Sequence, residues 1–213
     1  MLKKYKRTVI ITTLVALLPV VAGLLLWNQL PESIATHFGT NGEPDGWSSR
    51  GFAVFGLPAF IAAVNVLCAV ATSADPKKQN IQPKIFKLIL WICPMVSLIC
   101  CGGVYAYALG LPVSMEKLCM IFVGVVFIII GNYLPKCRQS YTVGIELPWT
   151  LASEENWNRT HRMAGGLWMA GGAVLTLMSL LGQISVFIFL PVVLVMTLVP
   201  TVYSYLLFRK LGA

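Results

Sequence analysis

The sequence predicts an all-α membrane protein, a bundle of six transmembrane helices with both termini in the cytoplasm. Hydrophobic residues make up 57% of its 213 residues and charged residues only 11%, whereas roughly a quarter of the residues in soluble domains are charged. Six apolar runs approach the length of about 20 residues that crosses a bilayer, and the basic residues gather in alternate connections between them. A soluble domain of this composition would have almost no polar surface.

Each apolar run is predicted to be a helix, because in hydrocarbon every backbone amide must be paired within the protein. The first run follows four basic residues like a signal peptide, but it is too long and no small-residue cleavage site follows it, so we predict a retained helix. The spans contain essentially no ionisable side chain, which disfavours an ion-coupled transporter. The runs cover residues 8–27, 52–72, 86–109, 118–134, 165–181 and 184–208.

The charge distribution predicts which connections face the cytoplasm. Cytoplasmic loops carry an excess of Lys and Arg, and a cytoplasmic N-terminus places 14 of the 16 such residues inside, leaving Arg50 and Lys117 outside. The net charge of +8 is therefore a topology signal, and no direct contact with nucleic acid is predicted. The cytoplasmic basic residues are Lys3, Lys4, Lys6, Arg7, Lys77, Lys78, Lys84, Lys87, Lys136, Arg138, Arg159, Arg162, Arg209 and Lys210.

The first outer connection contains a dense polar stretch, THFGTNGEPDGW at 36–47. We expect a short interfacial turn or helix at 31–38, followed by turns at Asn-Gly and Pro-Asp-Gly. Three interpretations stay open: side chains that hydrogen-bond within their own loop, a binding surface for an extracellular peptide or other ligand, and a metal site. A single His is weak support for a metal. The binding surface would consist of His37, Asn41, Asp45 and Trp47.

The longest polar segment, 135–164, is predicted to be cytoplasmic. Ser153 can cap a helix that begins with two acidic residues. On this helix Trp157 and His161 are four residues apart, as are Glu155 and Arg159, so each pair is predicted to be neighbours on the helix surface. One interpretation is an interfacial helix with aromatic anchors and Arg side chains directed at anionic headgroups of the lipid bilayer.

The inner segment also resembles the signature of the SdpI family, and the outer stretch resembles a domain of unknown function that often precedes this signature. The first resemblance is carried by NYLPK at 132–136, Gly144-Ile145, PWTL at 148–151, Glu155, Trp157 and Thr160-His161-Arg162. The second is carried by Pro31, His37-Phe38-Gly39, Gly42 and Pro44-Asp45-Gly46. Together they divide the chain into a two-helix module at 1–74, with the outer loop, and a four-helix module at 75–213, with the signature loop at 135–164.

The resemblance implies a multi-pass protein of the bacterial cytoplasmic (inner) membrane that gives immunity to a secreted, membrane-active peptide toxin. It also implies that the toxin-engaged protein holds a transcriptional repressor at the membrane. Glu146-Leu147 stand where the family usually has a basic residue and a small hydroxyl residue. This reversal of charge counts against binding of the same repressor by this chain. The residues expected to face the cytoplasmic partner are Tyr133, Pro135, Lys136, Arg138, Trp149, Glu155, Trp157, Arg159, His161 and Arg162.

We expect a non-enzymatic immunity or sensor protein with no cofactor and no metal. The alternatives are a membrane enzyme acting on lipid or peptide, and a small transporter. For an enzyme, Glu154, Glu155 and His161 are the only plausible general acid–base group. No activated nucleophile with an orienting partner is visible in the sequence.

Overall fold

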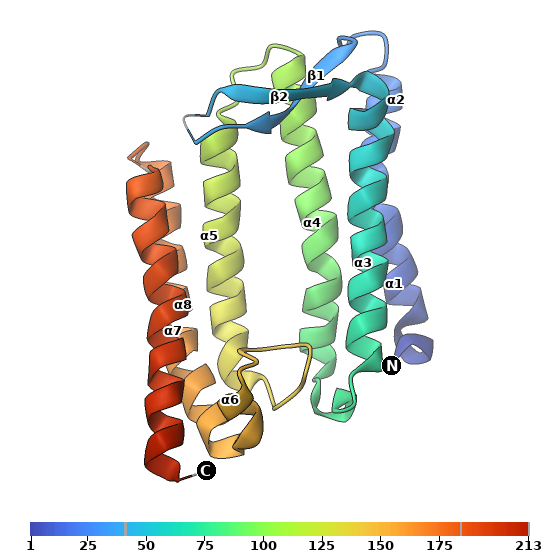
Figure 1. Cartoon of the computed structure of the whole chain (residues 1–213). Coiled ribbons are helices and arrows are strands. Elements are labelled where there is room, and N and C mark those ends of the chain that lie inside the picture. Colours follow the sequence, from blue (N-terminus) through green and yellow to red (C-terminus); the bar gives the residue numbers. More distant parts are fainter. Residues whose placement is uncertain (41, 184, 213) are drawn as a thin grey trace. The chain divides into compact units, whose positions relative to one another are not determined.

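The computed structural model describes residues 1–40, 42–183 and 185–212. Within this part of the chain six helical segments are long and apolar enough to cross a membrane (Figure 1). They are Leu2–Leu25, Phe52–Ala74, Pro83–Ala108, Met115–Lys136, Glu154–Leu180 and Val186–Leu211. The predicted class, an all-α polytopic membrane protein, is confirmed, whereas the cytoplasmic location of the termini stays a prediction.

The helices are α1 (Leu2–Ala16), α2 (Leu18–Leu25), α3 (Leu57–Ala74), α4 (Pro83–Ala108), α5 (Met115–Tyr133), α6 (Pro148–Ala152), α7 (Glu154–Leu180) and α8 (Val186–Leu211). The first span is divided at Leu17, two residues before Pro19, whose ring removes a backbone N–H. A π-helical turn at Phe52–Gly56 leads into α3.

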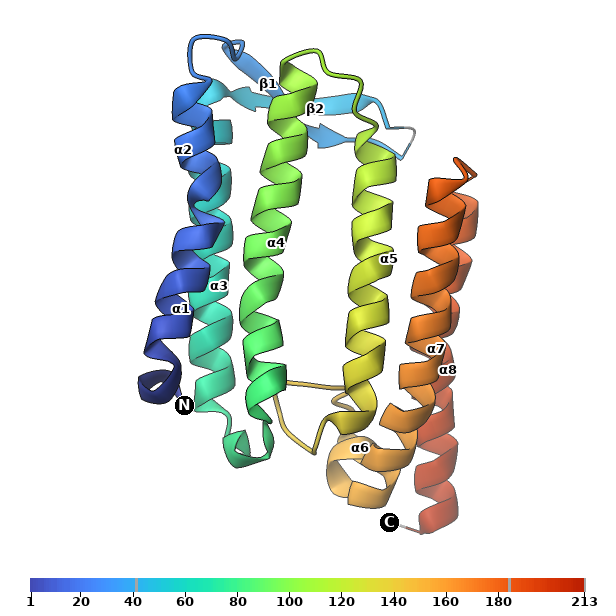
Figure 2. The same ribbon diagram turned by 180° about the vertical axis from the view of Figure 1, so that it is seen from behind.

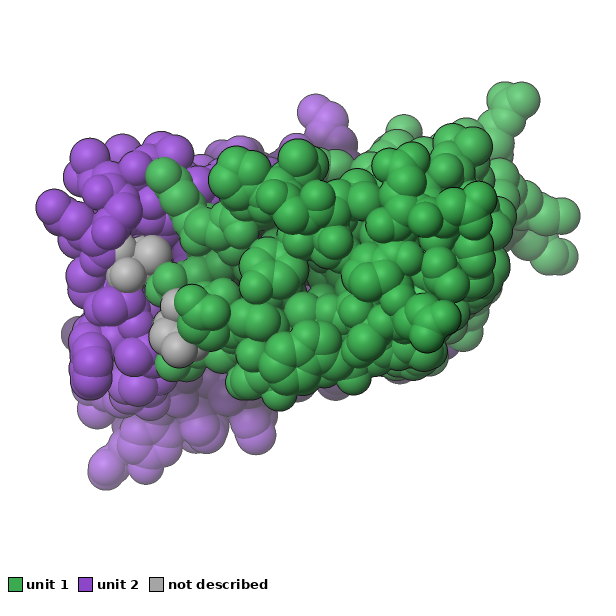
Figure 3. Space-filling view, turned by 90° about the horizontal axis from the view of Figure 1, so that it is seen from above, with its two compact units in different colours: residues 1–73, 86–119 green, residues 74–85, 120–213 purple. Residues whose placement is uncertain are grey.

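The chain forms two compact units (Figure 3). Unit 1 comprises Met1–Ser73 and Phe86–Cys119, and unit 2 comprises Ala74–Ile85 and Met120–Ala213. The division of the sequence into modules at 1–74 and 75–213 stays a prediction.

A β-hairpin joins α2 to the second span in unit 1. Strands β1 (Ser33–Phe38) and β2 (Pro44–Ser49) pair antiparallel from Ser33 opposite Ser49 to Phe38 opposite Pro44. The prediction of a turn or short helix at 31–38 is therefore wrong. Gly46 of β2 stands opposite His37, and an added Cβ there would lie 2.9 Å from the Cβ of His37, so this position has no room for a side chain. The strand consequently lacks the hydrophobic alternation by which strands are recognised.

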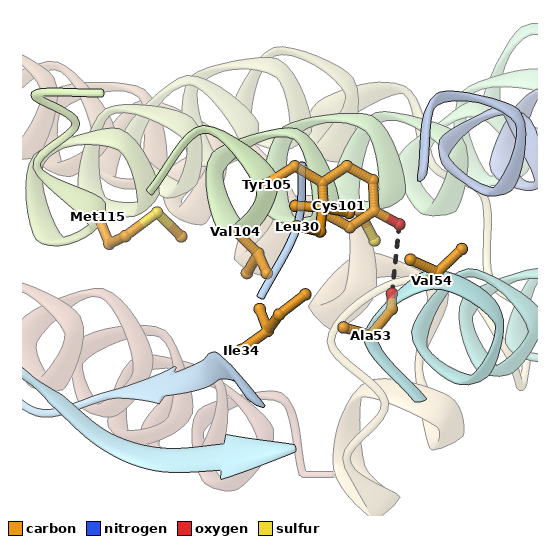
Figure 4. Close-up of a cluster of buried hydrophobic side chains, with 8 residues drawn as sticks. All are labelled: Leu30, Ile34, Ala53, Val54, Cys101, Val104, Tyr105 and Met115. Carbon is orange, nitrogen blue, oxygen red and sulfur yellow. Dashed lines mark hydrogen bonds between the residues drawn. The ribbon is translucent and has the colours of Figure 1, made fainter. Parts of the chain in front are cut away.

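The apolar core of unit 1 lies beneath this hairpin (Figure 4). Ile34 of β1 packs among side chains from α4 and from the start of the second span, and Tyr105 donates a hydrogen bond to the Ala53 carbonyl over 3.3 Å. Phe38 at the end of β1 meets Tyr107 edge-on, with ring centroids 5.0 Å apart. The hairpin is therefore anchored to the helices through its inner face.

Polar side chains join the spans of unit 1, in which α1 lies beside α3 (Figure 2). The Asn65 amide of α3 donates to the hydroxyls of Thr12 and Thr13 in α1, each over 3.1 Å. Ser97 of α4 donates to the Ala16 carbonyl over 2.6 Å, where α1 ends. Such bonds replace the water that a bilayer does not supply.

In unit 2, α7 packs beside α8, and α5 approaches α7 closely through glycine. A Cβ added at Gly131 of α5 would lie 2.8 Å from the Gly165 carbonyl oxygen, and one at Gly124 would lie 2.8 Å from that of Gly172. Small residues at such crossings allow helix backbones to approach. The signature loop joins the end of α5 to the start of α7, and this close packing holds the two helices together beside it.

Candidate functional site

The outward face of the hairpin carries an exposed ionisable pair. Nδ1 of His37 lies 2.5 Å from Oδ1 of Asp45, and the two side chains are 74% and 54% exposed. Trp47, two residues further along β2, is 58% exposed. Three of the four predicted outer residues thus lie together on the hairpin, while Asn41 lies outside the described residues. His37 bonds a carboxylate rather than a carbonyl of its own loop.

The base of the hairpin is held by Arg50. Its guanidinium donates to the carbonyls of Trp27 and Leu30 over 2.7 and 3.0 Å and lies 4.6 Å from the centroid of the Trp27 ring. Its backbone N–H donates to the Glu32 carbonyl over 2.8 Å. Arg50 therefore has a structural role at the base of the hairpin.

On the inner side, Trp157 and His161 are stacked neighbours but are buried rather than on the helix surface. Their rings are 4.0 Å apart with an interplanar angle of 22°. The Trp157 indole donates to the Cys137 carbonyl over 2.8 Å. Nε2 of His161 accepts the Ile145 N–H over 2.8 Å, so Nδ1 carries the proton and donates to the Trp157 carbonyl. Both ring nitrogens are thus committed to holding the loop.

Gly144 explains why a glycine stands before Ile145 in the signature. Its φ is +134°, and an added Cβ would lie 2.5 Å from Nε2 of His161 and 2.7 Å from the ring of Trp157. Only a residue without a side chain adopts this conformation readily and passes this close to both rings.

The PWTL part of the signature forms α6, which is bonded to the residues before it and to α8. Thr150 accepts the Leu147 N–H and donates to the Ile145 carbonyl over 2.7 Å. The Trp149 indole donates to the Ser204 hydroxyl of α8 over 2.7 Å. Asn156 of α7 donates to the Ser204 carbonyl over 2.9 Å, so one turn of α8 binds both α6 and α7.

The remaining predicted inner residues are exposed or half-buried. Glu155 and Arg159 form the predicted ion pair at 2.7 Å, and Ser153 caps α7 by accepting the Asn156 N–H, both as expected. The Lys136 ammonium lies 5.1 Å from the centroid of the Tyr133 ring. Tyr133 and Trp149 are half-buried, and the exposed residues are Pro135, Lys136, Arg138, Glu155, Arg159 and Arg162.

The connection between α3 and α4 is a part of the inner site that the sequence reasoning missed. Asp75, Lys77, Asn80 and Gln82 all bond the segment 136–142 through their side chains. The sequence offered one signal for it, the Asp75-Pro76 pair that follows α3. An Asp at a helix end can predict a turn, because its side chain hydrogen-bonds the backbone two residues on. The partners some 60 residues away were not visible in the sequence.

Two titratable groups of the loop have shifted pKa values. Burial raises the pKa of the Cys137 thiol to about 11. Burial also raises the pKa of Glu146, and the negative charge of Asp75 adds to this shift. No group of three or more His, Cys, Asp or Glu side chains that could hold a metal ion occurs within the described residues.

The fold and site define a multi-pass helical membrane protein with a hairpin on one connection and a hydrogen-bonded loop on another. Residues 136–204 match the SdpI/YfhL protein family, and residues 14–62 match a domain of unknown function, DUF1648. The chain is 23% identical to Immunity protein SdpI of Bacillus subtilis (strain 168) over 208 residues, covering 95% of this chain and 97% of that protein. These matches agree with the resemblance to the SdpI family that the sequence indicated.

A second protein is similar over a shorter stretch. An uncharacterized protein of Archaeoglobus fulgidus is 35% identical over 65 residues, which is 30% of this chain and 35% of that protein. No solved structure matches the chain.

Proposed function

We propose that the chain is an immunity protein of a bacterial cytoplasmic membrane, and that it protects against a secreted, membrane-active peptide that contacts the outer hairpin. The observation that carries this proposal is the similarity to Immunity protein SdpI over 95% of the chain, which includes both the hairpin and the signature loop. A match confined to the hairpin or to the signature loop would support the proposal for that part of the chain alone.

The geometry of the hairpin supports a contact surface there. Exposed aromatic side chains are favoured where proteins bind partners, because they bury a large area with few rotatable bonds. Trp47 offers such a ring, and the His37–Asp45 pair beside it offers both a donor and an acceptor. None of these three side chains is needed by the apolar core beneath the hairpin.

The enzyme alternative has less support from the geometry. His161 uses both ring nitrogens for backbone hydrogen bonds, so it has no nitrogen left for a substrate proton. Glu155 is paired with Arg159. A general acid–base group needs a site within hydrogen-bond reach of the substrate, and the inner His is buried within the loop that it supports.

We further propose that the exposed inner residues contact a cytoplasmic partner, for which the family resemblance implies a transcriptional repressor. This surface comprises Pro135, Lys136, Arg138, Arg159 and Arg162, with Glu155 paired to Arg159 and with half-buried Tyr133 and Trp149 at its edge. Trp157 and His161 support the surface from within.

The test is survival of a toxin-sensitive bacillus that expresses this chain. Wild type is expected to protect, whereas His37→Ala, Asp45→Asn and Trp47→Ala are expected to protect much less at unchanged membrane abundance. Glu32→Gln and Leu111→Ala serve as matched controls, because Glu32 is an exposed outer acid and Leu111 is 54% exposed in another outer connection.

Three results would contradict parts of this proposal. Wild type that gives no protection against any secreted peptide removes the immunity function. Variants that lose protection only in proportion to their abundance make the hairpin a structural element. Controls that fail as badly as the hairpin variants show that the outer face is sensitive everywhere and has no defined contact.

A further inference from the structure

A buried carboxylate connects the α3–α4 connection to the signature loop in unit 2. Asp75 is 2% exposed. Its Oδ1 accepts the Lys77 N–H over 2.7 Å, and its Oδ2 accepts the Tyr141 N–H over 2.9 Å and the Thr142 hydroxyl over 2.7 Å. The first bond belongs to a local turn. The other two join residues 66 and 67 positions apart.

Three neighbouring side chains extend this connection. The Lys77 ammonium donates to the Gln139 side chain, and Asn80 donates to the Gln139 carbonyl over 2.8 Å. Gln82 donates to the Lys136 carbonyl over 2.9 Å. The Gln139 amide in turn donates to the carbonyls at the end of α6, at 3.0 and 2.9 Å. The loop is thus bonded from Asp75 on one side and from the Trp157–His161 stack on the other.

We infer that Asp75 is the positioning residue of the signature loop, holding it in the conformation that presents the exposed inner residues. The connection between α3 and α4 is therefore part of the inner site, although it lies outside both matched segments, 14–62 and 136–204. A turn alone would need only one oxygen of Asp75.

The chemistry of the site requires a carboxylate. An ionised Asp accepts hydrogen bonds at both oxygens, whereas an Asn of the same shape presents an NH₂ group at one of them. In Asp75→Asn that group would face an N–H or hydroxyl donor, and at least one bond would be lost. Bonds to charged groups are stronger than neutral ones, and a buried donor left without a partner is costly.

Cys137 supplies a native reporter of this positioning. Its thiol is buried, and its carbonyl accepts the Trp157 indole bond within the loop. Thiols react as thiolates, and burial keeps the Cys137 pKa near 11, so the folded loop labels slowly. The experiment treats purified full-length protein in detergent with a maleimide and locates the adducts by mass spectrometry, with Cys68 and Cys93 in the spans as internal references.

In Asp75→Asn, the maleimide is expected to modify Cys137 about tenfold faster than in wild type, which corresponds to the loss of one charged hydrogen bond. Thr142→Val, which removes one donor at an exposed position, is expected to give about a threefold increase. Adding Thr142→Asp to Asp75→Asn restores a donor–acceptor pair with the roles exchanged. This double variant is expected to return to within about threefold of wild type. Glu154→Gln, at an exposed acid of α7, is the control and should not change the rate.

The inference is overturned if Asp75→Asn leaves the Cys137 rate at the wild-type value, or if the exchanged pair gives no recovery. Faster labelling of Cys68 and Cys93 together with Cys137 also overturns it, because the change would then be general unfolding. The assay measures the loop and not protection. Its failure is therefore distinguishable from failure of the proposed function.

Discussion

The outer hairpin and the signature loop both place a His and a Trp in a connection between apolar helices, but they use them in opposite ways. His37 and Trp47 are mostly exposed, and the His37 side chain bonds the carboxylate of Asp45. His161 and Trp157 are almost completely buried and bond backbone groups of the loop. Most buried polar groups in folded proteins are hydrogen-bonded, because leaving them unpaired is costly. The inner pair therefore maintains structure, whereas the outer pair is the one that we propose for ligand contact.

The largest expected effect tests the inner half of this comparison. Gly144→Ala would place a Cβ against His161 and Trp157 at a positive φ, and we expect a loss of roughly 3 kcal/mol or more. Gly166→Ala is the control, because no described atom lies within 4 Å of its added Cβ. Thermal unfolding of the purified proteins measures both. Equal midpoints for Gly144→Ala and wild type would show that the loop packing is not needed.

Arg50 sharpens the comparison, because it is an outer residue with a structural role. Arg50→Lys would keep the charge but lose the paired bonds to the Trp27 and Leu30 carbonyls. We expect about 1–2 kcal/mol of destabilisation in the same unfolding assay. Arg138→Lys, at an exposed position, should have no measurable effect. A wild-type midpoint for Arg50→Lys would mean that the base of the hairpin is held by its apolar contacts alone.

A smaller effect on stability is expected at the exposed inner surface. Arg159→Glu with Arg162→Glu should change stability by no more than about 1 kcal/mol, because surface charges contribute little. Protection should persist while sedimentation of a repressor with the membranes is lost. In wild type this sedimentation should weaken as salt rises, because exposed charges are screened within about 8–10 Å. If the double variant protects no better than an empty vector, the two roles are inseparable.

The smallest expected effect concerns pH. The folded pKa of Glu146 lies above its ordinary value, so the ionised form is disfavoured in the folded loop. Loop stability should therefore fall as pH rises from the ordinary pKa of Glu through the raised one. Glu146→Gln should remove this dependence and slow Cys137 labelling slightly at neutral pH. The residue is exposed despite this partial burial, so we expect less than about a twofold change in rate. An identical pH profile in the variant would contradict this.

The features that the sequence predicted correctly depend either on residues close together in the chain or on a signal summed over many residues. Apolar runs predict spans because every residue contributes to the same signal, and the Ser153 cap and the Glu155–Arg159 pair need only four residues of context. The hairpin was missed because β2, PDGWSS, lacks the alternation of apolar and polar residues that predicts a strand. The burial of Trp157 and the role of Asp75 depend on partners 20 and 66 positions away, which no local pattern contains.

The bonds from Asn65 to Thr12 and Thr13 have a consequence for how the chain enters the membrane. Asn65 would be costly in hydrocarbon by itself, and its partner Thr12 precedes it by 53 residues, on a helix that is synthesised first. The first helix should therefore stay beside the insertion machinery until the second span arrives, so that both leave as a pair. Replacing Thr12 and Thr13 with Val should delay release of the second span into lipid, and crosslinking of Asn65-containing nascent chains to the insertion channel would measure the delay.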